Sequence, residues 1–581
     1  MPDIKPAPDK FAIAALLHEI GALLELKGGE YFKARAYKRA ARAVSELSED
    51  LGTLVRQNRL TFVSGVGQAI ARQIEEIYTT GKSKFLEQLR SKLPPGIVEL
   101  SRVRGMTVPK VEILQQALGI TTVEQLRAAA EAGKLRDIKG FGPRTEQRIL
   151  EAIERSQDRQ LRIHIHHAVR TGQRILEYLA TSQSFIEGEV AGSARRAKET
   201  VSRIIVVART KQSQTLIDHF LRLPIVISVQ DKSADTCSVT LSEGYRATVI
   251  AAQPKEYGAR LLYATGSAKH LRRLEEIAQK RNLRLSNRGL VSHTKTTKTA
   301  NRSRSEAQLY EQLAMQYVPP ELREDEGEIE AALKNKLPED LITTTDIRGM
   351  VHCHTMYSDG KHSVEQMVSA AESMGMKYIT ITDHSPTAFY AGGVKIDDLQ
   401  RQWEEIDRVQ AQTNVKILKG TESDILANGS LDYPDWILEQ FDVIVASIHS
   451  RYQMNSDQMT NRIMTAMRQP VFKIWGHALG RLIERRPPFE CRVEEVLDVI
   501  AESRAAVEIN GDPYRLDMEP RWLREARKRK IKFVISVDAH SMSALDNVRY
   551  GVGIARRAWI RRGEVLNTLG VKAFQKAVRP V

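Results

Sequence analysis

The sequence predicts a multidomain protein in which helical domains precede two α/β domains. Its 581 residues exceed what one hydrophobic core usually supports, so three or four domains are expected. Apolar residues recur at helical spacing within residues 9–90. After residue 347, β-rich runs alternate with helical segments, a pattern typical of a parallel, barrel-like fold.

These changes of pattern divide the chain into five expected segments. Residues 1–90 and 91–158 read as two helical domains, and residues 159–320 as a mixed α/β domain. The acidic stretch 321–346 reads as a linker, and residues 347–581 as the barrel.

The composition favours a cytoplasmic protein with an anionic partner. A formal net charge of +15 and a pI near 9.5 place nucleic acid first among such partners. The three cysteines lie far apart and suggest no disulfide framework, which fits a reducing compartment. No signal peptide and no bilayer-length apolar run is evident, so we expect no membrane partner and a place beside the nucleoid.

Two glycine turns in the helical part predict phosphate contacts. VSGVGQAIARQI contains Gly65 and Gly67, and DIKGFGPRTEQRIL contains Gly140 and Gly142. Both resemble the helix-hairpin-helix motif, in which glycines let the backbone approach a phosphate and the next helix offers free N–H donors. One such turn is often only a tight turn. Two in a basic, helical region favour DNA binding.

The basic stretch YFKARAYKRAARAV lies before the first of these turns. Lys33 and Lys38 are candidates for a Schiff-base lysine of a deoxyribose phosphate lyase. Lysines in a basic helical patch more often contact phosphates, which we consider the better interpretation here.

The middle domain is expected to contain a sheet. Four runs rich in β-branched residues read as strands, at 203–208, 224–230, 237–242 and 246–252. Residues 269–304 are strongly basic, and their Thr/Ser/Lys-rich end reads as an exposed loop.

VHCHTMYSDG, at residues 351–360, begins the most informative region. His352 and His354 are two residues apart, so on a strand both side chains point to one face, with Asp359 close behind. Cys353 would then point to the opposite face, into the core. Two imidazoles and a carboxylate are suitable metal ligands for a hydrolytic site.

Further potential ligands follow the later β-rich runs of the barrel. The full candidate set is His352, His354, Asp359, His384, Glu422, His449, His477, Asp538 and His540. Mixed imidazole and carboxylate ligands suit Zn, Mn or Fe, and nine residues are enough for two or three divalent ions. Glu422 is the expected bridging carboxylate. A single member such as His477 can be a hydrogen-bonded core histidine, but the complete set at strand ends argues for metal binding.

These segments resemble the PHP (polymerase and histidinol phosphatase) domain. HxH, DHS, GxExD, SxH, GHxxGR and DAH occur in that order between residues 349 and 543. The resemblance implies a distorted seven-stranded α/β barrel with a trinuclear metal site. Met350 stands where the family often has an aspartate, a change that can tune a ligand without removing it.

The whole chain resembles the bacterial family X DNA polymerases. GSARRAKET (192–200), YGARLLYATGSAKH (257–270) and YVPPELREDEGEIEAA (317–332) carry the resemblance outside the barrel. It implies an 8-kDa-like domain at 1–90, a fingers-like domain at 91–158, and a nucleotidyltransferase-like palm and thumb at 159–320.

The polymerase site departs from this family. Three aspartates hold its catalytic metals, and their positions fall on Arg203, Ile205 and Thr248. We therefore expect no Mg²⁺ site in the palm and no nucleotidyl transfer, because two-metal phosphoryl transfer needs acidic ligands. A vestigial nucleotide contact at Gly192, Ser193 and Arg196 is still compatible with the sequence. Leu271, directly after His270, stands where the family often has an asparagine.

The expected function is DNA repair by a metal-dependent 3′–5′ exonuclease and 3′-end phosphodiesterase. Its nucleophile would be a metal-bound hydroxide, and its substrate gapped, nicked or 3′-ended DNA bound by a monomer. Arg481 and Arg515 are candidate phosphate contacts, or salt-bridge partners within the barrel. The alternatives are a DNA-end-binding scaffold without catalysis and a small-molecule phosphatase of the PHP type.

Overall fold

A computed structural model gives the fold of the chain. It describes residues 10–580 except 28–29, 46–50, 64, 94–95, 101–102, 104–105, 139, 159–161, 242–243 and 293–303. The end of the basic stretch, expected to be an exposed loop, lies largely outside the described residues. Within the described part, no helix has the length and apolar character needed to cross a bilayer.

The chain forms two compact units. One comprises residues 1–162 with 213–249, and the other residues 163–212 with 250–581. The five domain limits expected from the sequence are finer than this division and stay a prediction.

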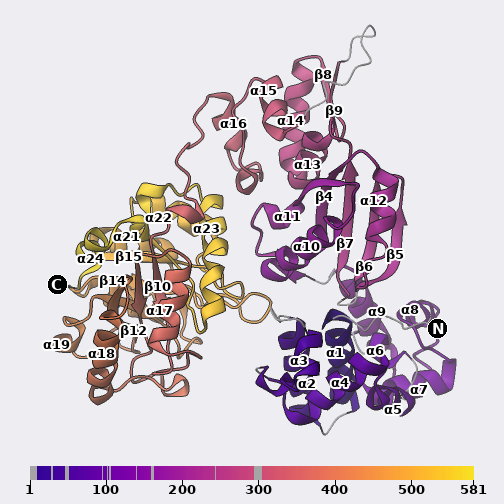
Figure 1. Ribbon diagram of the computed structural model, residues 1–581, viewed down its shortest axis with the longest axis horizontal. Helices are drawn as coiled ribbons and strands as arrows, with labels where there is room; N and C mark the ends of the chain where they lie inside the picture. The colour runs from indigo at the N-terminus through magenta and orange to yellow at the C-terminus, as the bar shows by residue number, and fades with distance from the viewer. Residues whose placement is uncertain are drawn as a thin grey trace. The chain divides into compact units, whose positions relative to one another are not determined.

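The N-terminal part of the first unit is helical, as expected (Figure 1). Its elements are α1 (Lys10–Lys27), α2 (Tyr31–Ser45), α3 (Leu51–Arg56), η1 (Leu60–Phe62), α4 (Gln68–Thr80), α5 (Lys84–Ser91), α6 (Ile97–Leu100), α7 (Val108–Leu118), α8 (Val123–Glu131) and α9 (Pro143–Asp158). Local signals start several of them. Ser83 accepts a hydrogen bond from Leu86 N, and Thr122 forms a capping box with Gln125. One apolar core, which includes Ile20, Ile74 and Phe141, joins these helices.

A five-stranded sheet follows, in the order β2-β4-β7-β6-β5. Its strands are β2 (Phe185–Val190), β4 (Ile204–Thr210), β5 (Val226–Lys232), β6 (Thr236–Leu241) and β7 (Arg246–Ala252). The four strands expected from the sequence are present, each shifted by no more than two residues. Strand β2 was not expected, because FIEGEV is polar and contains a glycine, as edge strands often do. The short strands β1 (Ile163–His164) and β3 (Thr200–Val201) pair separately, and α10 (Ile165–Leu179), α11 (Gly192–Arg195) and α12 (Ser213–Phe220) complete this part.

Residues 257–333 form a small helical region with one hairpin. It contains α13 (Tyr257–Thr265), α14 (Ala268–Lys280), β8 (Leu283–Ser286), β9 (Gly289–Ser292), α15 (Glu306–Gln312), η2 (Pro320–Leu322) and α16 (Glu328–Leu333). Two buried polar groups tie it together. His270 bridges Glu328 (2.7 Å) and the Tyr310 hydroxyl (2.9 Å), and Arg323 pairs with Glu306.

The C-terminal part is a seven-stranded parallel barrel. Its strands, in sequence and in sheet order, are β10 (Gly349–Cys353), β11 (Tyr378–Ile381), β12 (Lys416–Asp424), β13 (Val443–Ser447), β14 (Lys473–Trp475), β15 (Ala505–Asn510) and β16 (Phe533–Ser536). A parallel bridge between Cys353 and Ala539 brings the first strand to the segment after the last. His354 N donates to Ala539 O (2.9 Å) and Ala539 N to His352 O (3.0 Å), so the barrel is nearly closed at this end.

Helices surround the barrel strands (Figure 1). They are α17 (Val364–Ser373), α18 (Ile396–Gln410), α19 (Asp435–Leu438), α20 (Ser456–Arg468), α21 (Val493–Glu502), α22 (Pro520–Lys528), α23 (Val548–Arg557) and α24 (Val571–Val578). Short 3-10 turns are η3 (Thr344–Asp346), η4 (Phe389–Ala391), η5 (Met542–Asn547), η6 (Arg562–Glu564) and η7 (Leu566–Thr568). Capping boxes at Ser363 and Asn455 start α17 and α20.

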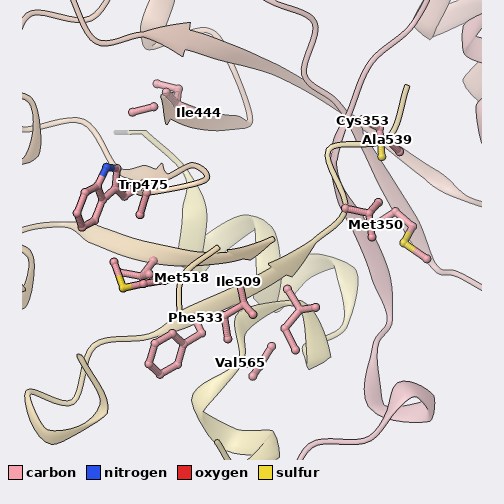
Figure 2. Close-up of a cluster of buried hydrophobic side chains, with 14 of the residues drawn as sticks. Met350, Cys353, Ile444, Trp475, Ile509, Met518, Phe533, Ala539 and Val565 are labelled. Atoms are coloured by element: carbon pink, nitrogen blue, oxygen red, sulfur yellow. The ribbon is translucent and has the colours of Figure 1, made fainter. Parts of the chain in front are cut away.

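The strands that carry the ligands pack on a buried apolar core. Trp475, Met518 and Phe533 are buried there together with Met350 and Cys353 (Figure 2). The expectation that Cys353 points to the core is therefore confirmed. Apolar side chains fix each strand from below, while polar side chains gather where the strands end.

Candidate metal centre

The ligand set expected from the sequence lies at the carboxyl ends of the barrel strands. His352 is on β10 and His354 directly follows it. His384, His449 and His477 each come two or three residues after a strand, and Glu422 lies near the end of β12. Asp538 and His540 follow β16. In a parallel barrel these ends meet at one face, so residues almost two hundred positions apart in sequence converge.

Eight of these residues form three overlapping groups. The groups are His354, Asp359, His384 and His540; His352, His354, Glu422 and Asp538; and His384, Glu422 and His449. Within each group the ligand atoms lie within 4.8 Å of one another. The ninth residue, His477, has its Nε2 2.8 Å from Glu422 Oε1 and 3.2 Å from His449 Nε2. The structure therefore brings the complete set together, with Glu422 at the junction as expected for a bridging carboxylate.

Several buried atoms of this cluster lack hydrogen-bond partners. They are His352 Nε2, both ring nitrogens of His354, His384 Nδ1, His477 Nδ1, Glu422 Oε2 and Asp538 Oδ1. Buried polar atoms are almost always satisfied in folded proteins, so this concentration needs an explanation. Divalent cations fit it, because imidazole nitrogens and carboxylate oxygens are their usual ligands.

Charges within the cluster keep its carboxylates ionised. Burial opposes the ionisation of Glu422, but His352, His449 and His384 outweigh it and hold the pKa of Glu422 well below its usual range. Burial likewise opposes ionisation of Asp538, and there His352 and His354 lower the pKa. Both carboxylates are thus available as anionic ligands at neutral pH.

The histidines divide into two classes. Burial and the neighbouring His540 and His384 lower the pKa of His354 to about 3, so its ring is neutral. Burial also acts against protonation of His449, but Glu422 and Asp424 overcome it and raise the pKa of His449 to about 9. A cation that binds at His449 must therefore displace a proton.

Three carboxylates that support the ligands were missed by the sequence analysis. Glu508 Oε1 accepts from His352 Nδ1 (2.6 Å), and Asp424 Oδ1 accepts from His449 Nδ1 (2.6 Å). Asp383 accepts from Thr355 N and Oγ1 at 2.7 and 2.6 Å, which anchors the loop after His354. Each is an acidic residue within or directly after an apolar strand, and this is the signal that could have identified them. Such partners fix the tautomer and orientation of ligating histidines.

The two candidate arginines differ in their surroundings. Arg515 Nε lies 3.1 Å from Asp538 Oδ2, and the buried Nη1 of Arg515 has no hydrogen-bond partner. Arg481 is buried between Glu199 (2.8 Å) and Glu519 (3.2 Å). Arg515 thus faces the ligand cluster, whereas the contacts of Arg481 fit the salt-bridge alternative.

The three residues that the sequence analysis assigned to the polymerase aspartate positions lie in or directly beside the five-stranded sheet. Arg203 is exposed just before β4, and Ile205 is half-buried on it. Thr248 lies on the neighbouring strand β7, where its hydroxyl is 2.9 Å from the Ser238 hydroxyl. Among the residues that the structure describes, every group of three or more His, Cys, Asp or Glu with ligand atoms within 4.8 Å of one another lies in the barrel.

The turn that was expected to contact a nucleotide is present, but its arginine binds other groups of the protein. Gly192 has a positive φ of 71°, and a Cβ there would lie 3.1 Å from Ile205. Arg196 is buried and donates to Glu324 (2.9 Å), Thr265 O (2.6 Å) and the Ser193 hydroxyl (3.3 Å). These contacts give Arg196 a structural role in the turn.

Both glycine turns of the helical region have the geometry of a tight hairpin. Gly65 and Gly140 have positive φ values of 86° and 94°. A Cβ at Gly67 or Gly142 would meet no atom within 4 Å, so the backbone before α4 and α9 is open. A phosphate can approach these N-termini closely.

A pocket of about 550 Å³ lies between α2 and the first turn, and Lys33, Tyr37 and Gly67 contribute to its lining. The two candidate lyase lysines are paired with carboxylates. Lys33 Nζ is 3.1 Å from Glu30, and Lys38 pairs with Glu25.

Comparisons with known proteins agree with this architecture. The helix-hairpin-helix domain family matches residues 8–83, and the SAM-like helix-hairpin-helix tandem family matches 97–155. The DNA polymerase beta thumb family matches residues 260–324, and the PHP domain family 351–512. Asp538 and His540 lie beyond that last segment.

One curated relative aligns over nearly the entire chain. It is the DNA polymerase/3′-5′ exonuclease PolX of Bacillus subtilis (strain 168), which is 33% identical over 563 residues, 96% of this chain and 97% of the relative. The chain belongs to the PolX family. This chain combines helix-hairpin-helix segments, a polymerase beta-like middle and a PHP barrel, and the architecture expected from the sequence is thereby confirmed.

Other curated relatives match about a third of the chain. A protein named probable phosphatase from Thermoanaerobacter sp. (strain X514) is 28% identical over 234 residues, 37% of this chain and 89% of the relative. Another probable phosphatase, from Caldanaerobacter subterraneus, is 27% identical over 208 residues, 32% of this chain and 74% of the relative.

Proposed function

We propose that this PolX-family protein removes nucleotides or blocking groups from DNA 3′ ends as a metal-dependent 3′–5′ exonuclease and phosphodiesterase. The observation that carries the proposal is the convergence of eight ligand residues in three overlapping groups, within each of which the ligand atoms lie within 4.8 Å, with His477 next to Glu422 as a ninth. These ligands are His352, His354, Asp359, His384, Glu422, His449, His477, Asp538 and His540. They suit two or three ions of Zn, Mn or Fe.

The residues of the barrel prepare the site for a phosphodiester. Bound cations would supply a polarised phosphate and a water of lowered pKa. Glu508 accepts the Nδ1 proton of His352, so Nε2 is the ring nitrogen that can bind a cation once its own proton is displaced. Arg515 carries a buried N–H without a partner beside Asp538, and it can bind a phosphate oxygen there.

We further propose that nucleotidyl transfer has been lost. Two-metal transfer needs carboxylates that neutralise the ions, and Arg203, Ile205 and Thr248 offer none. Arg203 adds a positive charge where a cation would have to bind. The proposed loss departs from the name of the Bacillus subtilis relative, which includes both DNA polymerase and 3′-5′ exonuclease.

The DNA is proposed to be gapped or nicked and to be bound by a monomer. Basic charge and two open helix N-termini support backbone contacts without sequence readout. The carboxylate partners of Lys33 and Lys38 favour a structural or phosphate-contact role over a lyase.

One gel tests the proposal. A gapped duplex labelled at the primer 5′ end is incubated with the protein and with Mn²⁺, Zn²⁺ or Fe²⁺, with and without dNTPs. We expect the primer to shorten and never to lengthen, and His352→Ala to abolish shortening together with metal content. Templated extension that is lost in Thr248→Ala but retained in His354→Ala would refute the proposal. Full metal content without hydrolysis of any DNA end would leave the scaffold alternative.

The matches to probable phosphatases support one second candidate, a small-molecule phosphatase. The two functions differ in which ester is hydrolysed faster. If p-nitrophenyl phosphate is consumed with a higher kcat/KM than an oligonucleotide 3′ end, the phosphatase is the better assignment.

A further inference from the structure

Two exposed aromatic rings lie beside the ligand cluster. Phe389 is 86% exposed, the largest fraction among the large hydrophobic side chains that the structure describes, and Tyr390 is 61% exposed. They occupy η4, between the ligand His384 and helix α18. Exposed aromatic rings next to a reaction centre commonly contact the substrate.

The rings stand on a fixed backbone. Ala388 and Ala391, on either side of them, are buried. The loop closes on itself through Ala391 N to Ala388 O (2.9 Å) and Val394 N to His384 O (2.7 Å). Thr387 N also donates to Asp432 (2.8 Å). The exposure of the two rings is thus built into an ordered turn.

Tyr390 reaches the ligands directly. Its ring centroid is 6.2 Å from that of His384 and 6.2 Å from that of His449, and both histidines belong to one ligand group. Phe389 continues outward from Tyr390 at 6.4 Å, with the two ring planes 77° apart. The aromatic surface therefore begins at the ligand cluster and extends into solvent.

We propose that Phe389 and Tyr390 form a stacking platform for the base of the 3′-terminal nucleotide. The inference rests on the proposed exonuclease function. Every nucleobase has a π-face, and stacking on aromatic side chains holds single-stranded DNA without sequence preference. A base that is stacked on this platform places its own phosphodiester toward His384 and His449, where the ligand groups meet. Phe389 and Tyr390 are positioning residues, because they hold the base and not the phosphate.

The test compares two 3′ ends on the full-length protein loaded with Mn²⁺. One substrate is a 5′-labelled single-stranded oligothymidylate, and the other is the same strand with a tetrahydrofuran abasic unit at its 3′ terminus. The phosphates are identical, so only the terminal base differs. The variants are the double Phe389→Ala/Tyr390→Ala, the single Phe389→Leu, and the double Phe389→Tyr/Tyr390→Phe, which keeps both rings.

The platform predicts that its removal raises KM only when the terminal base is present. The double alanine variant should raise KM for the thymidylate end about 5- to 100-fold with little change in kcat, and should change KM for the abasic end less than twofold. Phe389→Leu should lose part of the affinity, although leucine is similarly apolar, because it has no π-face. The variant with exchanged rings should behave as wild type.

Each outcome decides one question. Wild-type protein that holds metal but degrades neither strand would refute the exonuclease function itself. If the wild-type protein is active, but the double alanine variant shows an equal rise in KM for both 3′ ends or a rise for neither, the platform alone is refuted. If the double alanine variant binds less Mn²⁺ than wild type, Phe389→Leu provides the test, because the Phe389 ring contacts Tyr390 and no ligand histidine among the described ring contacts.

Discussion

Glu508→Gln is the change that most directly tests how the barrel prepares its ligands. The side chain is fully buried and receives four donors. Its Oε1 accepts from His352 Nδ1 (2.6 Å) and from the Ser536 hydroxyl, while its Oε2 accepts from His477 N and from Asn510 Nδ2 (3.2 Å). A glutamine has the same size but only one acceptor atom, so two of these donors must face an NH₂ group.

Both orientations of the glutamine harm the site. If the NH₂ group faces His477 N, a buried backbone N–H loses its acceptor, which costs about 1–3 kcal/mol. If it faces His352 Nδ1, the ring must move its proton to Nε2, which removes the lone pair that would bind a cation. Changes of this kind weaken metal affinity or activity by about 10- to 100-fold, or about 1.4–2.8 kcal/mol.

The assay is a competitive Mn²⁺ or Zn²⁺ titration of the chelator-treated protein, followed by the primer-shortening assay. Glu328→Gln is the matched control. Glu328 is also buried and receives His270 Nδ1 at 2.7 Å, but no ligand group includes it. Both variants should unfold at lower temperature, and only Glu508→Gln should bind metal more weakly. A Glu508→Gln protein with metal affinity within twofold of wild type would refute the reasoning, as would an equal loss in Glu328→Gln.

Three further outcomes are expected. Burial raises the pKa of Asp517 to about 6, and its Oδ1 has no hydrogen-bond partner. Because this folded pKa lies above the usual 3.8, the favourable contribution of the protonated acid is complete below pH 3.8 and is lost as the pH rises through 6. The stability of wild type relative to Asp517→Asn should therefore fall by about 2.4 kcal/mol between pH 4 and 7 in denaturant titrations, and a flat difference would contradict this. Gly67→Asp should weaken duplex DNA binding at least tenfold in fluorescence anisotropy without lowering Tm. The control Gly570→Asp, at an equally open helix start, should bind duplex DNA normally. Equal losses of DNA affinity in the two variants would argue against phosphate contact at the hairpin. Phe533→Ala should reduce the unfolding free energy of the barrel by ~3–5 kcal/mol in urea, against at most about 0.5 kcal/mol for the partly exposed Leu569→Ala, and similar values for the two would disprove the core assignment.

Much of the barrel could be predicted because its signals are local. Alternation of apolar strand and polar strand end identified His384, Glu422 and His449 without any knowledge of contacts, since parallel strands present their ends at one face. The spacing of His352 and His354 placed both on one face, and their ring centroids are 5.2 Å apart. Strand β2 was not predicted because its polar sequence has no strong strand signal.

The supporting residues could not be predicted in the same way. Glu508 lies 156 positions from His352, and nothing in VEIN indicates which ring it orients. Arg481 and Arg515 both follow barrel strands with similar sequence surroundings, yet one lies between Glu199 and Glu519 and the other faces Asp538. Such partners depend on which loops meet above the barrel.

The sequence by itself determined that acidic and imidazole residues follow the barrel strands, and that Arg203, Ile205 and Thr248 in the middle of the chain are not acidic. Residue type and strand position are properties of the chain alone. Only the tertiary structure decided that Glu422 joins two ligand groups, that Glu508 holds His352 and that the exposed Tyr390 lies beside His384 and His449. These facts depend on distances between segments far apart in sequence, which are fixed when the barrel closes and its core packs.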